Sequence, residues 1–434
     1  MSPRITRRGL FAGGVSIAAT AGLSGCIGGG SGTTAQSGAG QPTTATGAPV
    51  TIQASFGDQK SRDAFLKVAA DYTGSPKPQV NVMATEQLRA QLSTYLSSSN
   101  PPDIVSWYAG SVARDYASKG LLLDLSDLWT GDGACAGFSP ALKSLSSDKN
   151  GHQIFVPTSY YWWSVFYFKS SFEKWGVSVP TTWDEFMSLC KTLKGKGVAP
   201  LAQGIGSTAW MASGWFDYLD LRVNGAQYHR ELLAGEHAFT DKQVTDVLTE
   251  YKRLIPYFDP NMKSYSYQEA VTPMLQDKSA MYLIGAFISQ SVGNRLDDLD
   301  FFSVPPINTS VPSAEEAPTD GFFASAGSKN PVGAKDVLSY LASPKAQQQN
   351  IQLAGSANLP TSKDVDTSNF SPLVQKGIKL LQDTKEITQF FNRDSSDALQ
   401  LTADRNLGKF LDNPNDIPAI QKAWQADAEK VWKS

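Results

Sequence analysis

The chain has 434 residues, a formal net charge of −3 and an aromatic content of 11%, including 10 Trp. This mildly acidic charge argues against nucleic acid as the partner, because nucleic-acid binding requires a basic surface. The three histidines, His152, His229 and His237, have no paired spacing, so we expect no metal site and no cofactor.

The first residues carry the most specific pattern in the chain. Thr6–Phe11 (TRRGLF) is a twin-arginine pattern, and a weakly apolar stretch follows from Leu10 to Leu23. At helical rise this stretch would extend roughly 21 Å, which is shorter than the roughly 30 Å of a bilayer core. We therefore predict a twin-arginine signal peptide at residues 1–25 rather than a membrane span.

The apolar stretch ends in Leu23–Cys26 (LSGC), which resembles the lipobox of bacterial lipoproteins. This resemblance implies that Cys26 is acylated and anchors the protein at the outer face of the cell membrane. An ordinary leader with a chance cysteine is the alternative. Residues 26–49 are rich in Gly, Ser, Thr and Ala and carry no charge, so they predict a disordered tether.

The body of the chain, from about Val50, is too long for one core and predicts two lobes. Strand-like apolar runs at 51–55, 80–83 and 103–107 alternate with helical patterns at 60–72 and 85–96. This order predicts a mostly parallel sheet covered by helices. No apolar run in the body is long enough to span a membrane.

Two cysteines remain in the body, Cys135 and Cys190. Cys190 shares a helical face with Phe186 and Leu193, which favours a buried structural thiol. A disulfide between Cys135 and Cys190 is the alternative, and the sequence leaves it open.

Several short stretches match known signatures in one order across about residues 50–362. They are Pro101–Val105, Gly120–Leu125, Phe166–Lys169, Phe172–Gly176, Pro180–Glu185, Lys278–Met281 with Gly285, Ala334–Leu338 and Ser343–Pro344. Together they resemble the bacterial extracellular solute-binding proteins (family 1 type) of ABC sugar importers, especially actinobacterial lipoproteins.

This resemblance implies an α/β fold of the periplasmic-binding-protein type, with two lobes, a hinge and an interlobe ligand cleft. We expect lobe one at 50–158 and 285–343, and lobe two at 159–284 and 344–434. The implied function is that of a monomeric, extracellular substrate-binding lipoprotein, not an enzyme. It would capture a sugar or oligosaccharide by lobe closure and deliver it to the membrane permease of an ABC transporter.

A sugar site needs aromatic rings for the C–H faces of the sugar and polar or charged groups for its hydroxyls. Candidates lie near strand ends or where the resemblance implies ligand contacts. Structural alternatives compete for most of them: a helix cap for Asp58, an ion pair for Asp217 and Arg393, and core packing for Trp107, Trp215 and the aromatics of 161–163. The candidates are Asp58, Trp107, Tyr161, Trp162, Trp163, Trp210, Trp215, Asp217, Phe287, Asp320 and Arg393.

Three other functions compete with sugar import. A glycoside hydrolase would need two opposed carboxylates in the cleft, and no motif marks such a pair. A binding protein for a peptide, polyamine or metal would not need so many Trp residues. An adhesin or sensor subunit would bind a partner without a permease. The sequence leaves open the sugar, its length and linkage, and which aromatics of 160–163 face the cleft.

Overall fold

The computed structural model describes residues 47–57, 59–355 and 357–433. The predicted signal peptide, the lipobox cysteine Cys26, most of the predicted tether and the candidate Asp58 lie outside these residues. All described residues belong to one unit of the chain, Pro42–Ser434. Among them, no helix combines the length and the apolar character that crossing a membrane would require.

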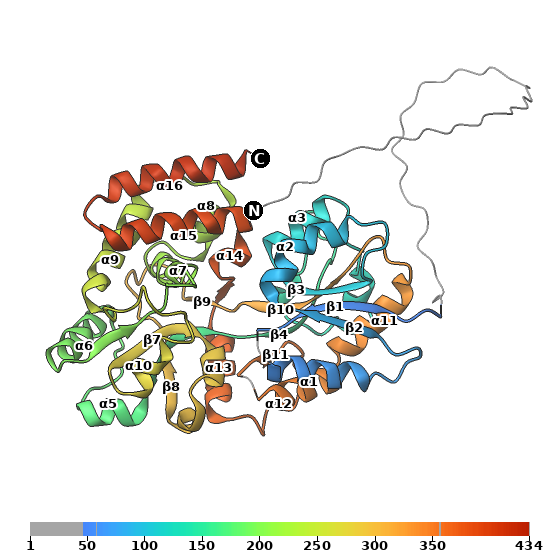
Figure 1. Cartoon of the computed structure of the whole chain (residues 1–434), viewed down its shortest axis with the longest axis horizontal. Coiled ribbons are helices and arrows are strands. Elements are labelled where there is room, and N and C mark those ends of the chain that lie inside the picture. The colour runs from blue at the N-terminus through green and yellow to red at the C-terminus, as the bar shows by residue number, and fades with distance from the viewer. Residues whose placement is uncertain (1–46, 58, 356, 434) are drawn as a thin grey trace, which may run out of the picture. The chain divides into compact units, whose positions relative to one another are not determined.

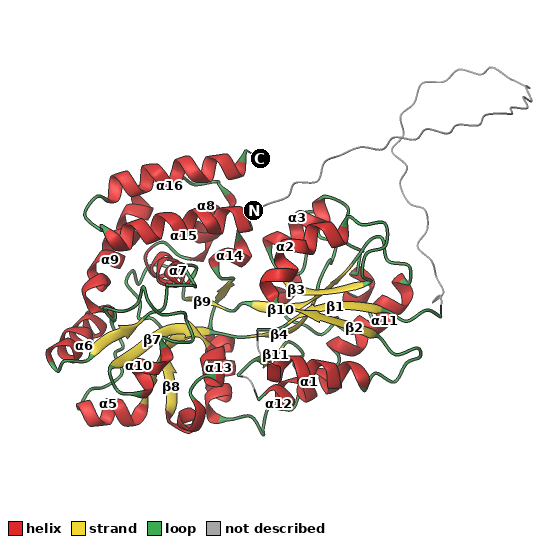
Figure 2. Ribbon diagram, viewed as in Figure 1, coloured by secondary structure: helices red, strands yellow, loops and turns green. Residues whose placement is uncertain are grey.

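The first sheet has six strands in the order β11-β4-β10-β3-β1-β2 (Figure 2). β1 pairs in parallel with β2 and β3, while β10 runs antiparallel between β3 and β4. The three predicted strands are confirmed as β1, β2 and β3. The strands are β1 (Thr51–Ser55), β2 (Gln79–Met83), β3 (Ile104–Tyr108), β4 (Val156–Tyr160), β10 (Thr319–Ala324) and β11 (Leu359–Pro360).

Helices cover both faces of this sheet (Figure 1). Side chains alternate along β3, so Ile104 packs with α1, α11 and α12, and Val105 packs with α2 on the other face. The helices of this lobe are α1 (Gln59–Ala70), α2 (Thr85–Leu96), α3 (Ser111–Ser118), α4 (Pro140–Leu145), α11 (Pro331–Ala342) and α12 (Pro344–Ala354), with the 3-10 helix η1 (Ser126–Trp129).

The second sheet has four strands in the order β6-β7-β5-β8. Its central strand β5 is buried at every position, as expected for a strand covered on both faces. A short parallel pair, β9 with β12, is separate from both larger sheets. The strands are β5 (Trp163–Phe168), β6 (Ala199–Ala202), β7 (Ser279–Gly285), β8 (Leu299–Phe302), β9 (Ala314–Glu316) and β12 (Glu386–Thr388).

Most helices around the second sheet belong to one large apolar core. A capping box begins α6: the Thr182 hydroxyl accepts from the Glu185 amide, and the Glu185 carboxylate accepts from the Thr182 amide. The helices are α5 (Lys169–Trp175), α6 (Trp183–Gly195), α7 (Met211–Val223), α8 (Ala226–Ala234), α9 (Lys242–Leu254), α10 (Val271–Leu275), α13 (Pro372–Asp383), α14 (Phe391–Asp394), α15 (Asp397–Asp412) and α16 (Ile417–Trp432), with 3-10 helices η2 (Ile255–Tyr257), η3 (Ala286–Gln290) and η4 (Gly293–Asp298).

The lobe limits expected from the sequence differ from the strand pairing in two places. β8 falls in the range assigned to lobe one, yet it pairs with β5 in the second sheet. α12 and β11 fall in the range assigned to lobe two, yet α12 packs on α1 and β11 pairs with β4. Gln347 of α12 fastens these two elements together, because its side chain bonds the Thr361 hydroxyl and amide.

The two cysteines of the body are free and buried. Cys135 belongs to a core of the first lobe and Cys190 to the core of the second lobe. The open alternative of a disulfide between them is therefore excluded by their separation into different cores.

Candidate functional site

The ends of four strands meet where the chain passes from one sheet to the other. In the first sheet, Tyr108 at the end of β3 pairs with Asp320 near the start of β10. In the second sheet, Trp163 at the start of β5 pairs with Gly285 at the end of β7. Tyr161 lies in the two-residue link between β4 and β5. These strand ends form the candidate site, because polar and aromatic side chains from both lobes converge there.

Arg393 of α14 bonds residues of the other lobe and of the link. Its Nη1 donates to Asp320 Oδ1 at 2.8 Å, and its Nη2 donates to the Tyr161 hydroxyl at 3.0 Å. The guanidinium carbon lies 4.2 Å from the centre of the Tyr108 ring. Burial lowers the pKa of Arg393, but the Asp320 carboxylate and the two tyrosines raise it on balance, so the side chain stays charged.

A group of aromatic rings lies beside this arginine. Trp163 is 1% exposed and packs against Phe390 at 4.6 Å and Phe287 at 6.1 Å between ring centres. Trp210 lies 5.6 Å from Tyr267 and 5.5 Å from Phe390. Trp210, Tyr267 and Phe287 are partly exposed, so they offer ring surface to a ligand. The buried Trp163 packs against Trp210 and Phe287 on their inner side.

Ion pairs also join the segment from Arg393 to Asp397 to the first lobe. Arg89 of α2 lies 3.4 Å from Asp397, and Arg114 of α3 lies 3.7 Å from Asp394. Gly110 has a φ of 107°, and a Cβ added there would lie 2.5 Å from the Arg393 carbonyl oxygen. The backbone of α14 therefore touches the turn before α3.

Six of the predicted site residues are brought together in this way, and their ligand contacts remain a proposal. They are Tyr161, Trp163, Trp210, Phe287, Asp320 and Arg393. For the aromatics of 160–163, consecutive residues point to different surroundings: Tyr161 and Trp163 face the cluster, while Trp162 is fully buried against Phe301 at 5.2 Å.

Four other predicted site residues are buried in the cores, and their ligand contacts likewise remain a proposal. Trp107 is 4% exposed within the first-lobe core, and Trp215 is 1% exposed against Phe186. Trp162 and Asp217 are 0% exposed. These four side chains have little or no exposed surface in this structure.

Sequence reasoning missed four members of the cluster: Tyr108, Tyr267, Phe390 and Arg89. Tyr108 follows the predicted candidate Trp107 by one residue, and the strand extends one residue further than predicted. Phe390 stands in the same short segment as Arg393 and could have been found there. Tyr267 lies outside any helix or strand, so periodicity gave no signal for it.

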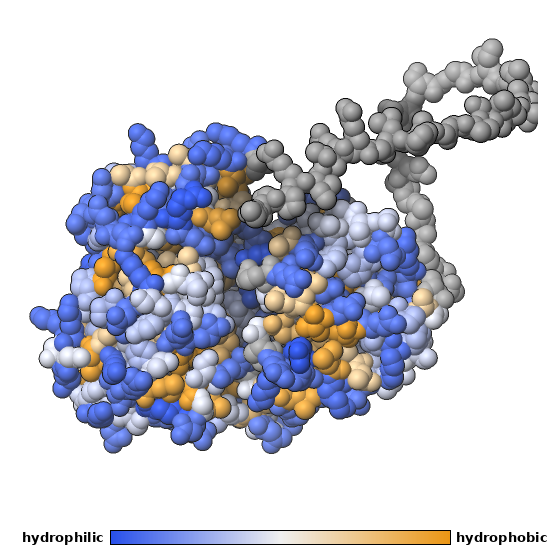
Figure 3. Space-filling view, in the orientation of Figure 1, coloured by the Kyte–Doolittle hydropathy of each residue, from blue (hydrophilic) through white to orange (hydrophobic). Residues whose placement is uncertain are grey.

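A cavity of about 620 Å³ adjoins α14. Its walls come from both lobes and include Arg114 of α3, Glu231 of α8, Asp394 and Trp432. Figure 3 shows the surface hollowed between the places of α14 and α3 in Figure 1, with mostly hydrophilic walls where they are visible. The junction of the lobes is thus indented on this face.

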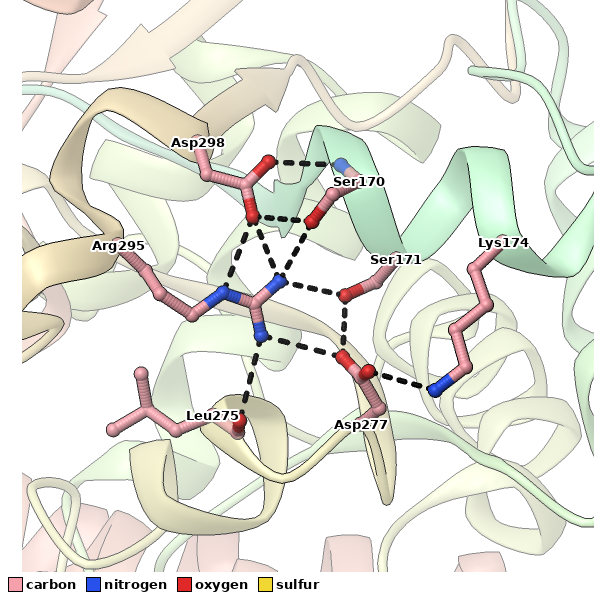
Figure 4. Close-up of polar contacts among 7 residues, drawn as sticks. All are labelled: Ser170, Ser171, Lys174, Leu275, Asp277, Arg295 and Asp298. Atoms are coloured by element: carbon pink, nitrogen blue, oxygen red, sulfur yellow. Dashed lines mark hydrogen bonds and ion pairs between the residues drawn. The ribbon is translucent and has the colours of Figure 1, made fainter.

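A second arginine cluster lies within the second lobe (Figure 4). Arg295 of η4 bonds Asp298 at 2.7 Å, Ser171 at 2.9 Å and Asp277 at 3.2 Å. Its guanidinium carbon lies 3.8 Å from the centre of the Phe168 ring. These contacts fasten η4 to α5 and to the turn after α10, which is a structural role.

Comparison with known proteins agrees with this fold. A family model for the bacterial extracellular solute-binding proteins matches residues 57–348. The α-glucosides-binding periplasmic protein AglE of Rhizobium meliloti (strain 1021) is 26% identical over 369 residues, which cover 79% of each chain. The multiple sugar-binding protein of Streptococcus mutans serotype c is 23% identical over 316 residues, 69% of this chain and 73% of that one.

Among solved structures, the bacterial solute receptor AcbH is similar with a TM-score of 0.79 and 28% identity. The match covers 88% of this chain and 98% of that chain. AcbH is described as having an exclusive substrate preference for β-D-galactopyranose. The two-lobe α/β fold expected from the sequence is confirmed by this likeness.

Proposed function

Because this chain belongs to the family of bacterial extracellular solute-binding proteins, we propose that it is the substrate-binding component of an ABC sugar importer. It captures a sugar or oligosaccharide between its two lobes. The observation that carries the proposal is the charged Arg393–Asp320 pair beside the partly exposed rings of Trp210, Tyr267 and Phe287.

The chemistry of this cluster suits a sugar. The rings cover the C–H faces of a pyranose, and Asp320 accepts hydrogen bonds from hydroxyl groups. A guanidinium has five N–H donors, and the recorded bonds of Arg393 use one on each terminal nitrogen. Bonds to ionised groups are the stronger ones, so this pair anchors and orients the ligand.

The chain passes between the lobes at Tyr161–Trp162, at Ala317–Pro318 and again between β11 and α13, and the two short links serve as the hinge. A ligand that touches both lobes binds the closed form better than the open form and so shifts the protein towards closure. The closed protein then delivers the sugar to the permease.

The same proposal covers the location and nature of the protein. Its family consists of exported binding proteins. We propose export by the twin-arginine route, acylation at Cys26, action as a monomer and no enzymatic activity. Replacing Cys26 with Ala should release the protein from membranes, which fractionation would measure.

A thermal-shift screen tests the proposal. The panel includes D-galactose, maltose and longer α-glucosides, because similar proteins are named for such ligands. A ligand that binds only the folded protein raises the free energy of unfolding by about 2.7 kcal/mol when its concentration is a hundredfold above Kd. No response to any sugar would contradict the proposal, and chromatographic detection of cleaved sugar would favour a glycosidase instead.

A further inference from the structure

Beside the candidate site, the second lobe buries more acidic than basic side chains. Asp217, Asp220, Glu315 and Glu316 are at most 3% exposed, and they share this region with two buried bases, Arg222 and His229. Burial of an unpaired charge is costly, so a buried carboxyl without a basic partner tends to hold a proton.

Two of the four acids have a basic partner. Glu315 Oε1 lies 2.6 Å from Arg222 Nη2, and Asp220 Oδ2 lies 2.9 Å from His229 Nδ1. Asp217 Oδ1 is 3.9 Å from His229 Nε2, which is beyond hydrogen-bond length. Asp217 and Glu316 are therefore the two acids whose charge is not matched.

These two carboxyl groups contact each other. α7 packs against β9, and the side chain of Asp217 on α7 interacts with that of Glu316 on β9. In the described part of the chain, no donor reaches Asp217 Oδ1 or either carboxyl oxygen of Glu316. Ionised carboxylates only accept, so a bond between the two groups requires a proton on one of them. Burial raises the pKa of both, and the neighbouring carboxyl raises that of Glu316 further.

Asp217 is connected to Arg393 by a hydrogen bond to α14, and Glu316 is connected to Asp320 along the chain. Asp217 Oδ2 accepts from the Phe391 amide at 2.9 Å, and Phe391 is the first residue of α14, two residues before Arg393. Glu316 is the last residue of β9, four residues before Asp320 on β10. The contact between Asp217 and Glu316 therefore connects the start of α14 with β9, the strand that leads into β10 of the first lobe.

We propose that Asp217 and Glu316 share one proton and act together as positioning residues for Arg393 and Asp320, so that losing this proton weakens sugar binding. Two ionised carboxylates in contact repel strongly in a buried setting. Their separation displaces β9 from α7, and with it Asp320 from Arg393. Only the binding measurement below rests on the proposed function.

The sign of the pH dependence follows from the proton. The positioned state holds it, so binding is strongest at low pH and is lost as pH rises through the raised pKa values of the pair. For one proton, the dissociation constant rises up to about tenfold per pH unit above that point. Other titratable groups that interact with the pair are Tyr218 and Asp220 of α7, His229 of α8, Tyr251 of α9, Glu315 of β9, Asp394 of α14, and Tyr161; Arg222 of α7 acts on their neighbours Tyr218 and Glu315.

The variant Glu316→Gln distinguishes the pH dependence caused by the Asp217–Glu316 pair from that caused by these neighbouring groups. Glutamine keeps a donor towards Asp217 but has no proton to lose. We expect the affinity of the variant for D-galactose or maltose to stay constant between about pH 7 and pH 9 in calorimetry, whereas that of the wild type falls. A variant profile that coincides with the wild type would overturn the proposal and point to His229 or another neighbour.

Two further variants complete this experiment, one as a substitute for Glu316→Gln and one as a control. Asp217→Asn can still accept from Phe391 and can donate to Glu316, so it should also abolish the pH dependence if Glu316→Gln fails to fold. Glu386→Gln is the matched control, because Glu386 lies on β12 next to β9 and pairs with Arg230 at the surface. It should keep the wild-type profile.

A sugar-free measurement decides the proposal even if neither sugar binds. Infrared difference spectra should show the carbonyl stretch of a protonated carboxylic acid in the wild type at neutral pH, and its absence in Glu316→Gln. Amide hydrogen exchange of Phe391–Asp394, corrected for intrinsic rates, should change with alkaline pH in the wild type only. An absent band, or unchanged exchange, refutes the inference; both as expected with no sugar response would instead contradict the proposed function.

Discussion

The two arginine clusters of this protein differ in where their partners come from. Arg295 bonds groups of the second lobe alone, and its recorded hydrogen bonds use Nε and both terminal nitrogens, some of them more than once. Arg393 bonds Asp320 across the junction and the Tyr161 hydroxyl in the link, once from each terminal nitrogen. A saturated arginine inside one lobe stabilises that lobe, whereas an arginine with remaining donors at a junction can also hold a ligand.

The largest effect should come from Arg393→Ala. It removes the charged donor and leaves Asp320 unpaired, so sugar affinity should fall by about 2–3 kcal/mol, or roughly 30- to 150-fold. Calorimetric titration would measure this. Arg393→Lys keeps the charge without the planar guanidinium, so its sugar affinity should lie between that of the wild type and that of Arg393→Ala. Equal affinity in wild type and Arg393→Ala would remove the arginine from the site.

Arg295→Ala should have the opposite signature. Losing the network should cost about 2 kcal/mol of unfolding free energy in denaturant titration, with sugar affinity unchanged. Loss of affinity without loss of stability would break the comparison between the two arginines.

The Arg295 effect should also depend on pH. Burial raises the pKa values of Asp277 and Asp298, but their hydrogen bonds, including those from Arg295, lower them on balance. The stabilisation is therefore present above the usual Asp value of about 3.9 and is lost as pH falls through the lowered values. The stability difference between wild type and Arg295→Ala should shrink in acid, as denaturation at several pH values would show.

Trp210→Ala sharpens the comparison for the aromatic residues. Removing a partly exposed ring at the site should weaken sugar binding about tenfold, or 1.4 kcal/mol, with little change in stability. The buried Trp215 offers the control: Trp215→Phe should lower stability and spare affinity. If Trp215→Phe weakens binding more than Trp210→Ala, the core assignment of Trp215 is wrong.

Arg89→Gln should have the smallest effect. Its ion pair with Asp397 is partly exposed, and such pairs contribute about 0–1 kcal/mol. We expect the substitution to change sugar affinity by at most a few-fold, and this difference from the wild type should become smaller at high salt. A loss comparable to that of Arg393→Ala would show that this pair belongs to the binding site.

Local patterns predicted local structure well. The first three strands depend on residues close in sequence, and all three are confirmed. The lobe limits depend on pairing between distant segments, such as β8 with β5, which local periodicity does not encode. For the same reason, the sequence could not assign elements to lobes correctly.

The candidate site was partly predictable. Trp162 and Trp163 are adjacent, and which of them faces the cluster follows from the pairing of Trp163 with Gly285, a residue far along the chain. The burial of Asp217 was not predicted, because nearly all of α7 is buried and the helix has no polar face to mark an interior carboxyl. Arg393 and Asp320 were found because their segments resemble those of the family.

The glycine before α3 sets how closely the halves of this molecule can approach. Because a methyl group on Gly110 would collide with the main chain of α14, an alanine at this position should keep the two lobes apart. A variant held in the open form would show, by its loss of affinity, how much free energy the closed form contributes to sugar binding.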